Sequence, residues 1–254
     1  MKFTAAIVSA ILAFTSVTEA APRNTRRGQS EGLSLTAQLQ LADTGLMRDG
    51  STNIFASAAD RFTLLPENND FIFDFNQEQQ NPGKGGQLIA ANRKTFPALV
   101  GTGSGMALGR IDPCGMNTLH VHPRSAELQV VTSGRLITEM VPENGVLDKD
   151  GNRRVIRTEL KANMMTPFYQ GSVHTQFNPD CEPATFIASF AAEDFGTGQI
   201  ADETFALSDD VIAATFGQSI AGEDIDKVRS AIPKSIALGV DECLKKCEIK
   251  KRSF

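Results

Sequence analysis

All three histidines of this 254-residue chain fall in two short apolar stretches. His120 and His122 stand in TLHVHPRSAE, which ends at Glu127, and His174 stands in YQGSVHTQFN. Imidazole nitrogens together with a carboxylate oxygen suit a divalent transition metal. A single histidine is more often an ordinary hydrogen-bonded residue, but here no imidazole lies outside the two stretches. The predicted ligands of one metal ion are therefore His120, His122, Glu127 and His174.

β-Strands would bring these ligands together. Alternate side chains of a strand share a face, so His120 and His122 point to the same side. From about residue 95 to residue 192, short runs rich in β-branched and aromatic residues are separated by Gly, Pro, Asn or Asp. Such runs at intervals of roughly ten residues predict an antiparallel sandwich or barrel. No internal repeat is visible, so we expect a single barrel that holds the metal ligands in its interior.

Helices are predicted on both sides of the β zone. Residues 35–65 have helix-like apolar spacing broken by Gly and Ser, and residues 71–75 have a short alternating pattern typical of a strand. Near the C-terminus, SDDVIAATFG, GEDIDKVRSAI and GVDECLKKCEIKKR have helical patterns, the first with a Ser cap. We therefore expect an N-terminal helical and loop segment over residues 21–65, a β-barrel over residues 66–200 and C-terminal helices over residues 201–254.

The first 20 residues, MKFTAAIVSAILAFTSVTEA, predict a secretory signal peptide with a small residue, Ala20, at the cleavage position. We therefore expect the mature protein outside the cell or in the cell wall. Arg26 and Arg27 mark either the end of a propeptide near residue 28 or a solvated basic tail. No apolar run reaches the ~20 residues of a membrane span, so a membrane is not an expected partner. Nor is nucleic acid, because the 25 basic and 30 acidic residues form no basic face.

The four cysteines are expected to form disulfides because a secreted protein passes through an oxidising compartment. Cys114 lies six residues before His120, and Cys181 lies seven residues after His174. If the two histidine strands are antiparallel neighbours, these cysteines are level with each other, which favours a bridge between Cys114 and Cys181. Cys243 and Cys247 are one helical turn apart, and either a local bridge or two free thiols would fit that spacing.

The two histidine motifs resemble those of the germin-like cupins. In that family the first motif is a glycine, an HxH pair, a glutamate and a second glycine, and the second motif is a glycine, a histidine and an asparagine. The matching residues here are Gly115, His120, His122, Glu127 and Gly134, then Gly171, His174 and Asn178. The leader and the GVDECLKKC tail are similar to the secreted fungal and spherulin-type branch of the family. The resemblance implies an all-β cupin jelly roll (a double-stranded β-helix), one barrel metal, usually manganese, and a homo-oligomer.

Some positions depart from the family pattern. Gly115 is one residue nearer to the HxH pair than usual, and Tyr169 stands where the second motif normally has proline. Oxalate oxidases of the germin type orient their substrate with two asparagines. Asn117 matches one of them, which implies a substrate-orienting role, but the other falls on Gly109. Because glycine offers no side-chain donor, the simplest oxalate oxidase assignment is weakened.

The predicted chemistry is that of an open metal site. Four protein ligands in an octahedral site leave two positions for water, dioxygen, superoxide or a carboxylate. Manganese(II) suits the ligand set, and iron, nickel or zinc are alternatives. We therefore expect a manganese-dependent redox enzyme that acts on superoxide, oxalate or another small acid, as a superoxide dismutase or a small-acid oxidase does. The alternative is a secreted, non-catalytic structural or stress protein of the spherulin type, in which the metal braces the barrel.

Overall fold

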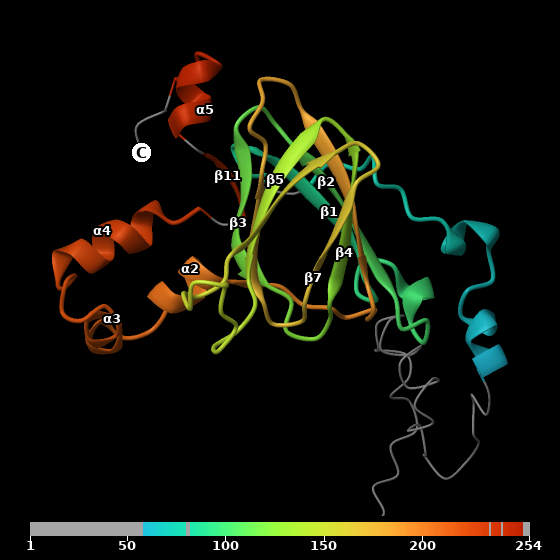
Figure 1. The fold of residues 1–254 in the computed structure, drawn as a ribbon. Coiled ribbons are helices and arrows are strands. Elements are labelled where there is room, and N and C mark those ends of the chain that lie inside the picture. The colour runs from blue at the N-terminus through green and yellow to red at the C-terminus, as the bar shows by residue number, and fades with distance from the viewer. Residues whose placement is uncertain (1–57, 80–81, 234, 240, 251–254) are drawn as a thin grey trace, which may run out of the picture. The chain divides into compact units, whose positions relative to one another are not determined.

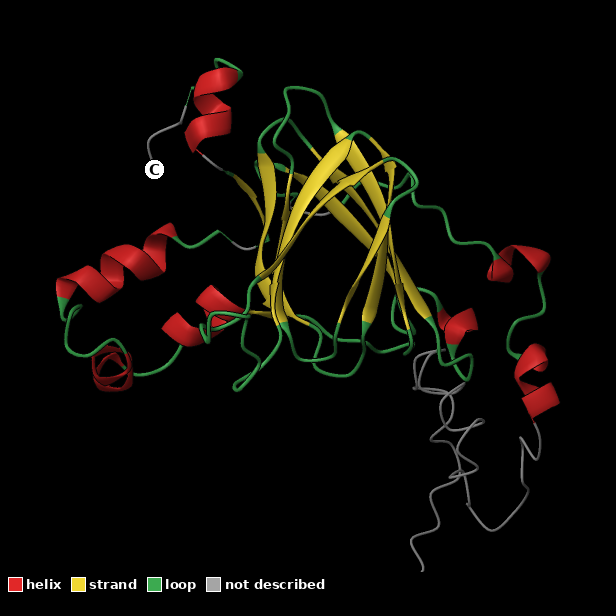
Figure 2. Cartoon of the chain, in the orientation of Figure 1, coloured by secondary structure: helices red, strands yellow, loops and turns green. Residues whose placement is uncertain are grey.

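The computed structural model describes residues 58–79, 82–233, 235–239 and 241–250 (Figure 1). The predicted signal peptide, the Arg26-Arg27 pair and most of the helical segment predicted over residues 35–65 lie outside these ranges. The described chain consists mainly of two antiparallel sheets that face each other, with short helices before and after the strands along the chain (Figure 2). This arrangement confirms the predicted all-β jelly-roll barrel with flanking helices.

The first sheet contains five strands in the order β1-β2-β9-β4-β7, and all neighbouring pairs are antiparallel. Their bounds are Gly86–Ala91 (β1), Gly105–Ile111 (β2), Ala184–Phe190 (β9), Glu127–Ser133 (β4) and Met165–Phe168 (β7). Side chains along β4 alternate between the interior and the surface, as the sequence pattern predicts: Glu127 and Gln129 are buried, whereas Leu128 is exposed.

The second sheet contains six strands, with β10-β3-β8-β5-β6 as its path and β11 paired with β3. Their bounds are Gly198–Gln199 (β10), Gly115–Val121 (β3), Val173–Phe177 (β8), Arg135–Val141 (β5), Ile156–Lys161 (β6) and Ile236–Leu238 (β11). A β-bulge interrupts the pairing of β3 with β8 between Asn117 and His120. These residues are three positions apart and would face opposite sides of a regular strand, but the bulge allows both to be buried.

Three short 3₁₀ helices, Ala58–Thr63 (η1), Asn68–Phe71 (η2) and Pro97–Leu99 (η3), lie outside the two sheets. The strand predicted over residues 71–75 is wrong, because Phe71 ends η2 and the residues after it form no ladder. A local turn forms here instead. The Asp74 carboxylate accepts hydrogen bonds from the backbone amide and the side chain of Asn76, at 2.8 and 2.9 Å. Side-chain bonds of this kind compete with a strand for the backbone donors.

Three helices follow β10, and the second and third match the predicted ones: Ile200–Phe205 (α2), Asp209–Thr215 (α3) and Glu223–Ala231 (α4). They have a small core of their own, built from Phe205, Ile212, Ala213 and Ile225. Arg229 of α4 links them further, since it donates to the Phe205 carbonyl and pairs with Asp209 of α3, at 2.8 and 2.7 Å. None of the described helices is long and apolar enough to cross a membrane.

The disulfide prediction is wrong in its pairing. Cys114 is bonded to Cys243, and Cys181 is bonded to Cys247. The expected proximity is still present, because the Cys114 amide donates to the carbonyl of Asp180, the residue before Cys181. The helix Asp241–Lys246 (α5) lies against this point, and Cys243 in α5 and Cys247 directly after it, with sulfurs 3.8 Å apart, each bond to one barrel cysteine. The helical spacing of Cys243 and Cys247 therefore serves two bridges to the barrel rather than one local bridge.

Candidate metal centre

The structure brings the four predicted ligands together inside the barrel. His120 lies on β3 and His174 on β8 of the second sheet, and His122 follows directly after the end of β3. His120 and His174 are direct partners in the ladder between β3 and β8. Glu127 begins β4 and reaches them from the first sheet. All four side chains are buried, with exposed fractions of 1 to 5%.

The ligand atoms form a tight cluster, in which all lie within 4.8 Å of one another. Oε2 of Glu127 lies 2.9 Å from Nε2 of His122 and 3.3 Å from Nε2 of His174. Aromatic rings wall the cluster. Phe168 stacks on His174 with ring centres 4.2 Å apart, and Phe190 meets the His122 ring edge to face at 4.7 Å. The rings pack against the imidazoles and cover the sides of the cluster.

Backbone carbonyls determine which imidazole nitrogen faces the centre. Nδ1 of His120, His122 and His174 lies 2.7, 2.6 and 2.9 Å from the carbonyl oxygens of Thr118, Gly196 and Ser172, respectively. A carbonyl only accepts, so Nδ1 of each ring carries the proton and donates it. Each Nε2 is then an acceptor. Three such nitrogens and a carboxylate oxygen converge without a donor, an arrangement that a cation satisfies. The donor set therefore fits a divalent metal ion.

Burial and the neighbouring groups also set suitable charge states. Burial, supported by nearby His174, lowers the pKa of His120 to about 3. Burial alone would raise the pKa of Glu127, but hydrogen bonds and charge attraction from His122 and His174, which act in the metal-free protein when Nε2 carries a proton, outweigh this effect and lower the pKa to about 2. At neutral pH the cluster therefore has a neutral His120 and an ionised Glu127. Metal ligation requires these states, because a protonated ligand competes with the metal.

A second group of polar side chains lies inside the barrel, two residues further along the strands than the metal ligands. Gln129 and Gln176 follow Glu127 and His174 by two residues and are fully buried. Gln129 pairs across the ladder with Thr166, and Gln176 pairs with Asn117 and Thr138. We call these five buried residues the amide layer: Asn117, Gln129, Thr138, Thr166 and Gln176. Asn117 was predicted from the family resemblance, whereas the two glutamines were missed. The signal was available, since residues two apart on a strand share a face.

Below the amide layer the interior is apolar. Val131 is two residues from Gln129 on β4, and Leu136 is two residues from Thr138 on β5. Both belong to the main apolar cluster, which also contains Ile111, Ala184 and Phe186. Gly109 pairs with Phe186, which pairs with Val131, so Gly109 lies at this apolar level. A Cβ atom on Gly109 would be 2.2 Å from the Phe186 ring. The ring therefore fills the space beside the position at which the family resemblance would place a second asparagine.

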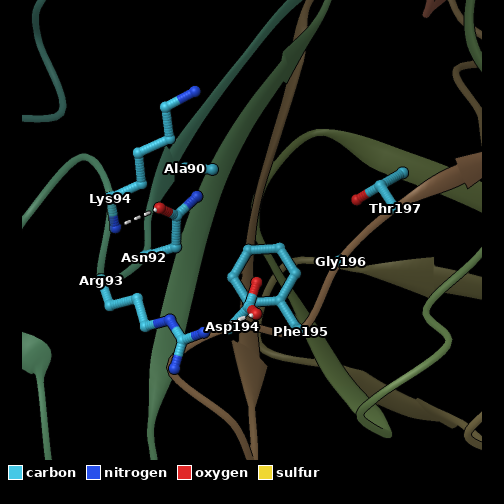
Figure 3. A pocket seen from close by; sticks show the side chains of 8 residues that line it. All are labelled: Ala90, Asn92, Arg93, Lys94, Asp194, Phe195, Gly196 and Thr197. Atoms are coloured by element: carbon cyan, nitrogen blue, oxygen red, sulfur yellow. Dashed lines mark hydrogen bonds and ion pairs between the residues drawn. The ribbon is translucent and has the colours of Figure 1, made fainter. Parts of the chain in front are cut away.

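The segment between β9 and β10 crosses from one sheet to the other beside the cluster. Gly196 accepts the hydrogen bond from His122, and Phe195 stacks on Phe190 with ring centres 3.7 Å apart. On this segment lies a cavity of about 380 Å³ (Figure 3). Its lining is Ala90, Asn92, Arg93, Lys94, Asp194, Phe195, Gly196 and Thr197. Since Phe195 and Gly196 contact His122 on one side and the cavity on the other, they separate the cavity from the metal ligands.

Comparison with known proteins identifies the family of this chain. The family model described as Cupin matches residues 74–224. The chain belongs to the cupin family. Spherulin-1A of Physarum polycephalum is 34% identical to this cupin over 193 residues, which are 75% of each chain. Germin-like protein subfamily 2 member 3 of Arabidopsis thaliana is 26% identical over 214 residues, 78% of this cupin and 92% of that protein. The predicted germin-like and spherulin-type resemblance is thus confirmed.

A solved structure supports the fold of this cupin. Recombinant oxalate oxidase in complex with glycolate aligns with a TM-score of 0.52 over 63% of this cupin and 82% of that chain. The sequence identity is 19%, so the likeness bears on the fold alone. The cluster of three histidines and a glutamate is able to bind a divalent metal ion, and its chemistry has to be argued from the residues of this chain.

Proposed function

We propose that this cupin is a secreted, manganese-dependent redox enzyme that acts on a small molecule. The convergence of four acceptor atoms, from His120, His122, Glu127 and His174, within 4.8 Å of one another carries the proposal. Manganese(II) suits three imidazoles and one carboxylate, although iron, nickel or zinc would be accepted by the same ligands. A bound manganese ion would supply a Lewis acid and a one-electron redox couple at this position.

The residues around the ligands would prepare the site for a small substrate. Phe168, Phe190 and Phe195 wall the cluster with apolar rings and limit the access of water, which strengthens electrostatic interactions within it. Asn117, in the amide layer, would orient the substrate through its carboxamide. Superoxide, oxalate and other small acids are the candidate substrates. The Phe186 ring beside Gly109 disfavours an oxalate oxidase that needs a second asparagine there.

Secretion is supported by the two disulfides, since such bonds persist in oxidising compartments. A homo-oligomer is supported by apolar side chains on the outer face of the first sheet, where Met106, Leu128 and Met165 are 39 to 59% exposed. N-terminal sequencing of the secreted protein would test the cleavage after Ala20. Light scattering of the same material would test the oligomer, and a monomeric mass at micromolar concentration would contradict it.

A non-catalytic structural role is the second candidate. The close burial of the four ligands, with exposed fractions of 1 to 5%, favours it, because a structural metal is usually fully enclosed by protein. Spherulin-1A, with 34% identity, supports the branch of the family for which we predicted this alternative. In this case the metal would brace the two sheets across the barrel, through Glu127 of one sheet and the histidines of the other.

Turnover assays on the manganese-loaded protein separate the two candidates. Superoxide dismutation and the oxidation of oxalate and glycolate would be measured for the natural protein and for His174→Ala. We expect turnover with at least one substrate and its loss in His174→Ala, with circular dichroism showing that the variant is folded. Glu139→Gln, which removes a carboxylate from the exposed ion pair with Arg157, is the control and should retain turnover. Absence of turnover, together with a large fall in melting temperature on chelation, would favour the structural role.

A further inference from the structure

Two buried carboxamides near the ligands have no hydrogen-bond partner within the described part of the chain. Neither Nε2 nor Oε1 of Gln129 and of Gln176 makes a hydrogen bond to any described residue, and both side chains are fully buried. Buried polar side chains are nearly always hydrogen-bonded, and those that are not call for a specific explanation. A core that served stability alone would place apolar side chains of similar volume at these positions. The two carboxamides therefore indicate a polar ligand.

Gln129 differs from the other amides in its position. Asn117 and Gln176 are ladder partners in the second sheet, on the same side as the histidines. Gln129 lies on β4 of the first sheet, two residues after Glu127, where its ladder partners are Ala188 and Thr166. Gln129 thus provides the only carboxamide from that sheet among the described residues of the amide layer. Thr166 of β7 is the other member of the amide layer from the first sheet, so a ligand between the sheets can meet a carboxamide on both sides only if Gln129 takes part.

The distance from the ligands limits the size of such a molecule. Two residues along a strand span roughly 7 Å, and the side chain of glutamine covers part of that distance. A molecule with two or three carbon atoms therefore reaches from a metal at the histidines to the Gln129 carboxamide. A longer chain would meet the apolar level that begins at Val131 and Leu136.

The charge of the interior limits the chemistry of the molecule. No Lys or Arg side chain is among the buried residues of the described chain. A divalent ion, the Glu127 carboxylate and one substrate carboxylate together carry no net charge. A second carboxylate in the amide layer would be a buried charge without a counter-ion, which is costly. Carboxamides and hydroxyls instead suit an uncharged oxygen, since they both donate and accept hydrogen bonds.

We infer that Gln129 is a substrate-positioning residue for a short hydroxy acid or oxo acid. The substrate carboxylate binds at the metal, and its hydroxyl or carbonyl group bonds to the carboxamide of Gln129. The role rests on the proposed function, because the metal holds the carboxylate. It extends that function by naming the substrate class, a two- or three-carbon monocarboxylate with an oxygen at its second carbon, in preference to a dicarboxylate such as oxalate.

Calorimetric binding to the manganese-loaded, full-length secreted protein tests this role at pH 7. The probes are glycolate, acetate, which lacks the second oxygen, and oxalate, which carries a second carboxylate. The variant is Gln129→Met, which preserves the volume and removes the hydrogen bonds. Gln77→Met makes the same chemical change at an exposed residue outside the sheets and is the matched control.

We expect the natural protein to bind glycolate more tightly than acetate or oxalate. Gln129→Met should weaken glycolate binding by about tenfold or more while acetate binding changes less than about twofold, because only glycolate can bond to the carboxamide. Gln77→Met should change neither. The metal-free Gln129→Met protein should melt at the same temperature as the natural protein or higher, whereas a purely structural glutamine would give a lower melting temperature.

Several outcomes would overturn the inference. Equal effects of Gln129→Met on glycolate and acetate, or no effect on either, would show that the carboxamide does not contact the second oxygen. Tighter binding of oxalate than of glycolate would refute the assigned charge of the substrate. In both cases manganese would still be bound, and the proposed metal function would stand. A protein that retains no manganese under these conditions would refute the proposed function and this role together.

Discussion

Two polar clusters lie at the two ends of β8, and they differ in how their hydrogen bonds are satisfied. At one end, Nε2 of His174 and the carboxylate of Glu127 are acceptors that face each other, and Gln176, two residues further along β8, lacks a protein partner among the described residues. At the other end, the Asn178 carboxamide donates to three backbone carbonyls at 2.7 to 3.2 Å and accepts from the amide of Asp180 at 2.9 Å. The second cluster is complete within the protein, whereas the first is not.

The complete cluster holds the fold together. The Asp180 carboxylate pairs with Arg135 at 2.6 Å and with Lys246 at 3.2 Å, and the two disulfides attach α5 beside it. The hydrogen bonds from Arg135 lower the pKa of Asp180 to about 2. A hydrogen-bond network in which every polar group has a partner makes a structure rigid. A buried network that lacks partners destabilises the fold unless a ligand completes it. The difference between the clusters separates a structural role from a functional one.

The largest effect is expected from Glu127→Gln. Loss of the anionic ligand should weaken manganese binding by at least about 100-fold, more than the loss of a group that only supports a ligand. The metal-free variant should remain folded, since the new carboxamide can donate to Nε2 of His122 or His174. Manganese titration of Glu127→Gln and of the control Glu139→Gln measures the effect. Equal affinities in the two variants would place the metal elsewhere.

The metal-free protein should lose stability as the pH falls. In the folded state the pKa of His120 is lowered from 6.5 to about 3, and that of Glu127 from 4.5 to about 2. Both groups therefore take up protons more readily in the unfolded state, so the stability they contribute is complete above pH 6.5. It should decline from pH 6.5 to about 3, and then further towards 2. Urea unfolding across this range checks the trend, and His120→Gln should flatten it between pH 6.5 and 3.

Removal of one disulfide should act on stability and leave the metal in place. Cys114 and Cys243 are 129 residues apart in sequence, so their bond restricts a long loop of the unfolded chain. The double variant Cys114→Ala, Cys243→Ala should lower the free energy of unfolding by about 2–5 kcal/mol. Urea unfolding and elemental analysis would be carried out on the same sample. Loss of manganese without loss of stability would reverse the roles assigned to the two clusters.

Asn178→Leu should also destabilise the protein, because it removes the hydrogen bonds that the buried carboxamide makes with three backbone carbonyls and one backbone amide. The expected loss in the free energy of unfolding is about 2–4 kcal/mol. Manganese affinity should be unchanged within error. A loss below the error of the unfolding measurement would mean that the Asn178 network is not what stabilises this end of the barrel.

Gln176→Met makes a similar change in the incomplete cluster and should have the smallest effect on stability. Its carboxamide has no described protein partner to lose, so the free energy of unfolding of the metal-free protein should change by less than about 1 kcal/mol or increase. The informative quantity is the difference between the changes in the free energy of unfolding caused by Gln176→Met and by Asn178→Leu. Equal destabilisation by the two variants would remove the distinction between the clusters.

The sequence was sufficient for the parts of the site that follow strand periodicity. The HxH spacing, the short β runs and the helix that begins after Ser208 are local patterns, and the structure contains these strands and this helix, although the Ser208 side chain makes no capping hydrogen bond. Asn117 lay beyond such reasoning from spacing alone, because its inward position depends on a β-bulge between it and His120. It was found only through resemblance to the family.

The wrong and missed predictions share a physical cause, because each depends on contacts between segments that are far apart in the sequence. The pairing of Cys114 depends on where α5 packs against the barrel. Cys114 and Cys243 are 129 residues apart, so no local sequence pattern determines that position. The alternating residues 71–75 form no strand because no neighbouring strand pairs with them and Asp74 turns the chain locally. Gln129 and Gln176 were on a predictable face, but their lack of partners became visible only when both sheets were in place.

Elemental analysis of protein secreted by a eukaryotic host, purified without chelators or an affinity metal, tests the central claim most directly. The convergent acceptors of His120, His122, Glu127 and His174 predict close to one manganese ion per chain. The same measurement on Glu127→Gln should give none. A folded natural protein without any bound metal would contradict the assignment of these residues as ligands, and stoichiometric zinc would contradict the redox chemistry while leaving the ligands in place.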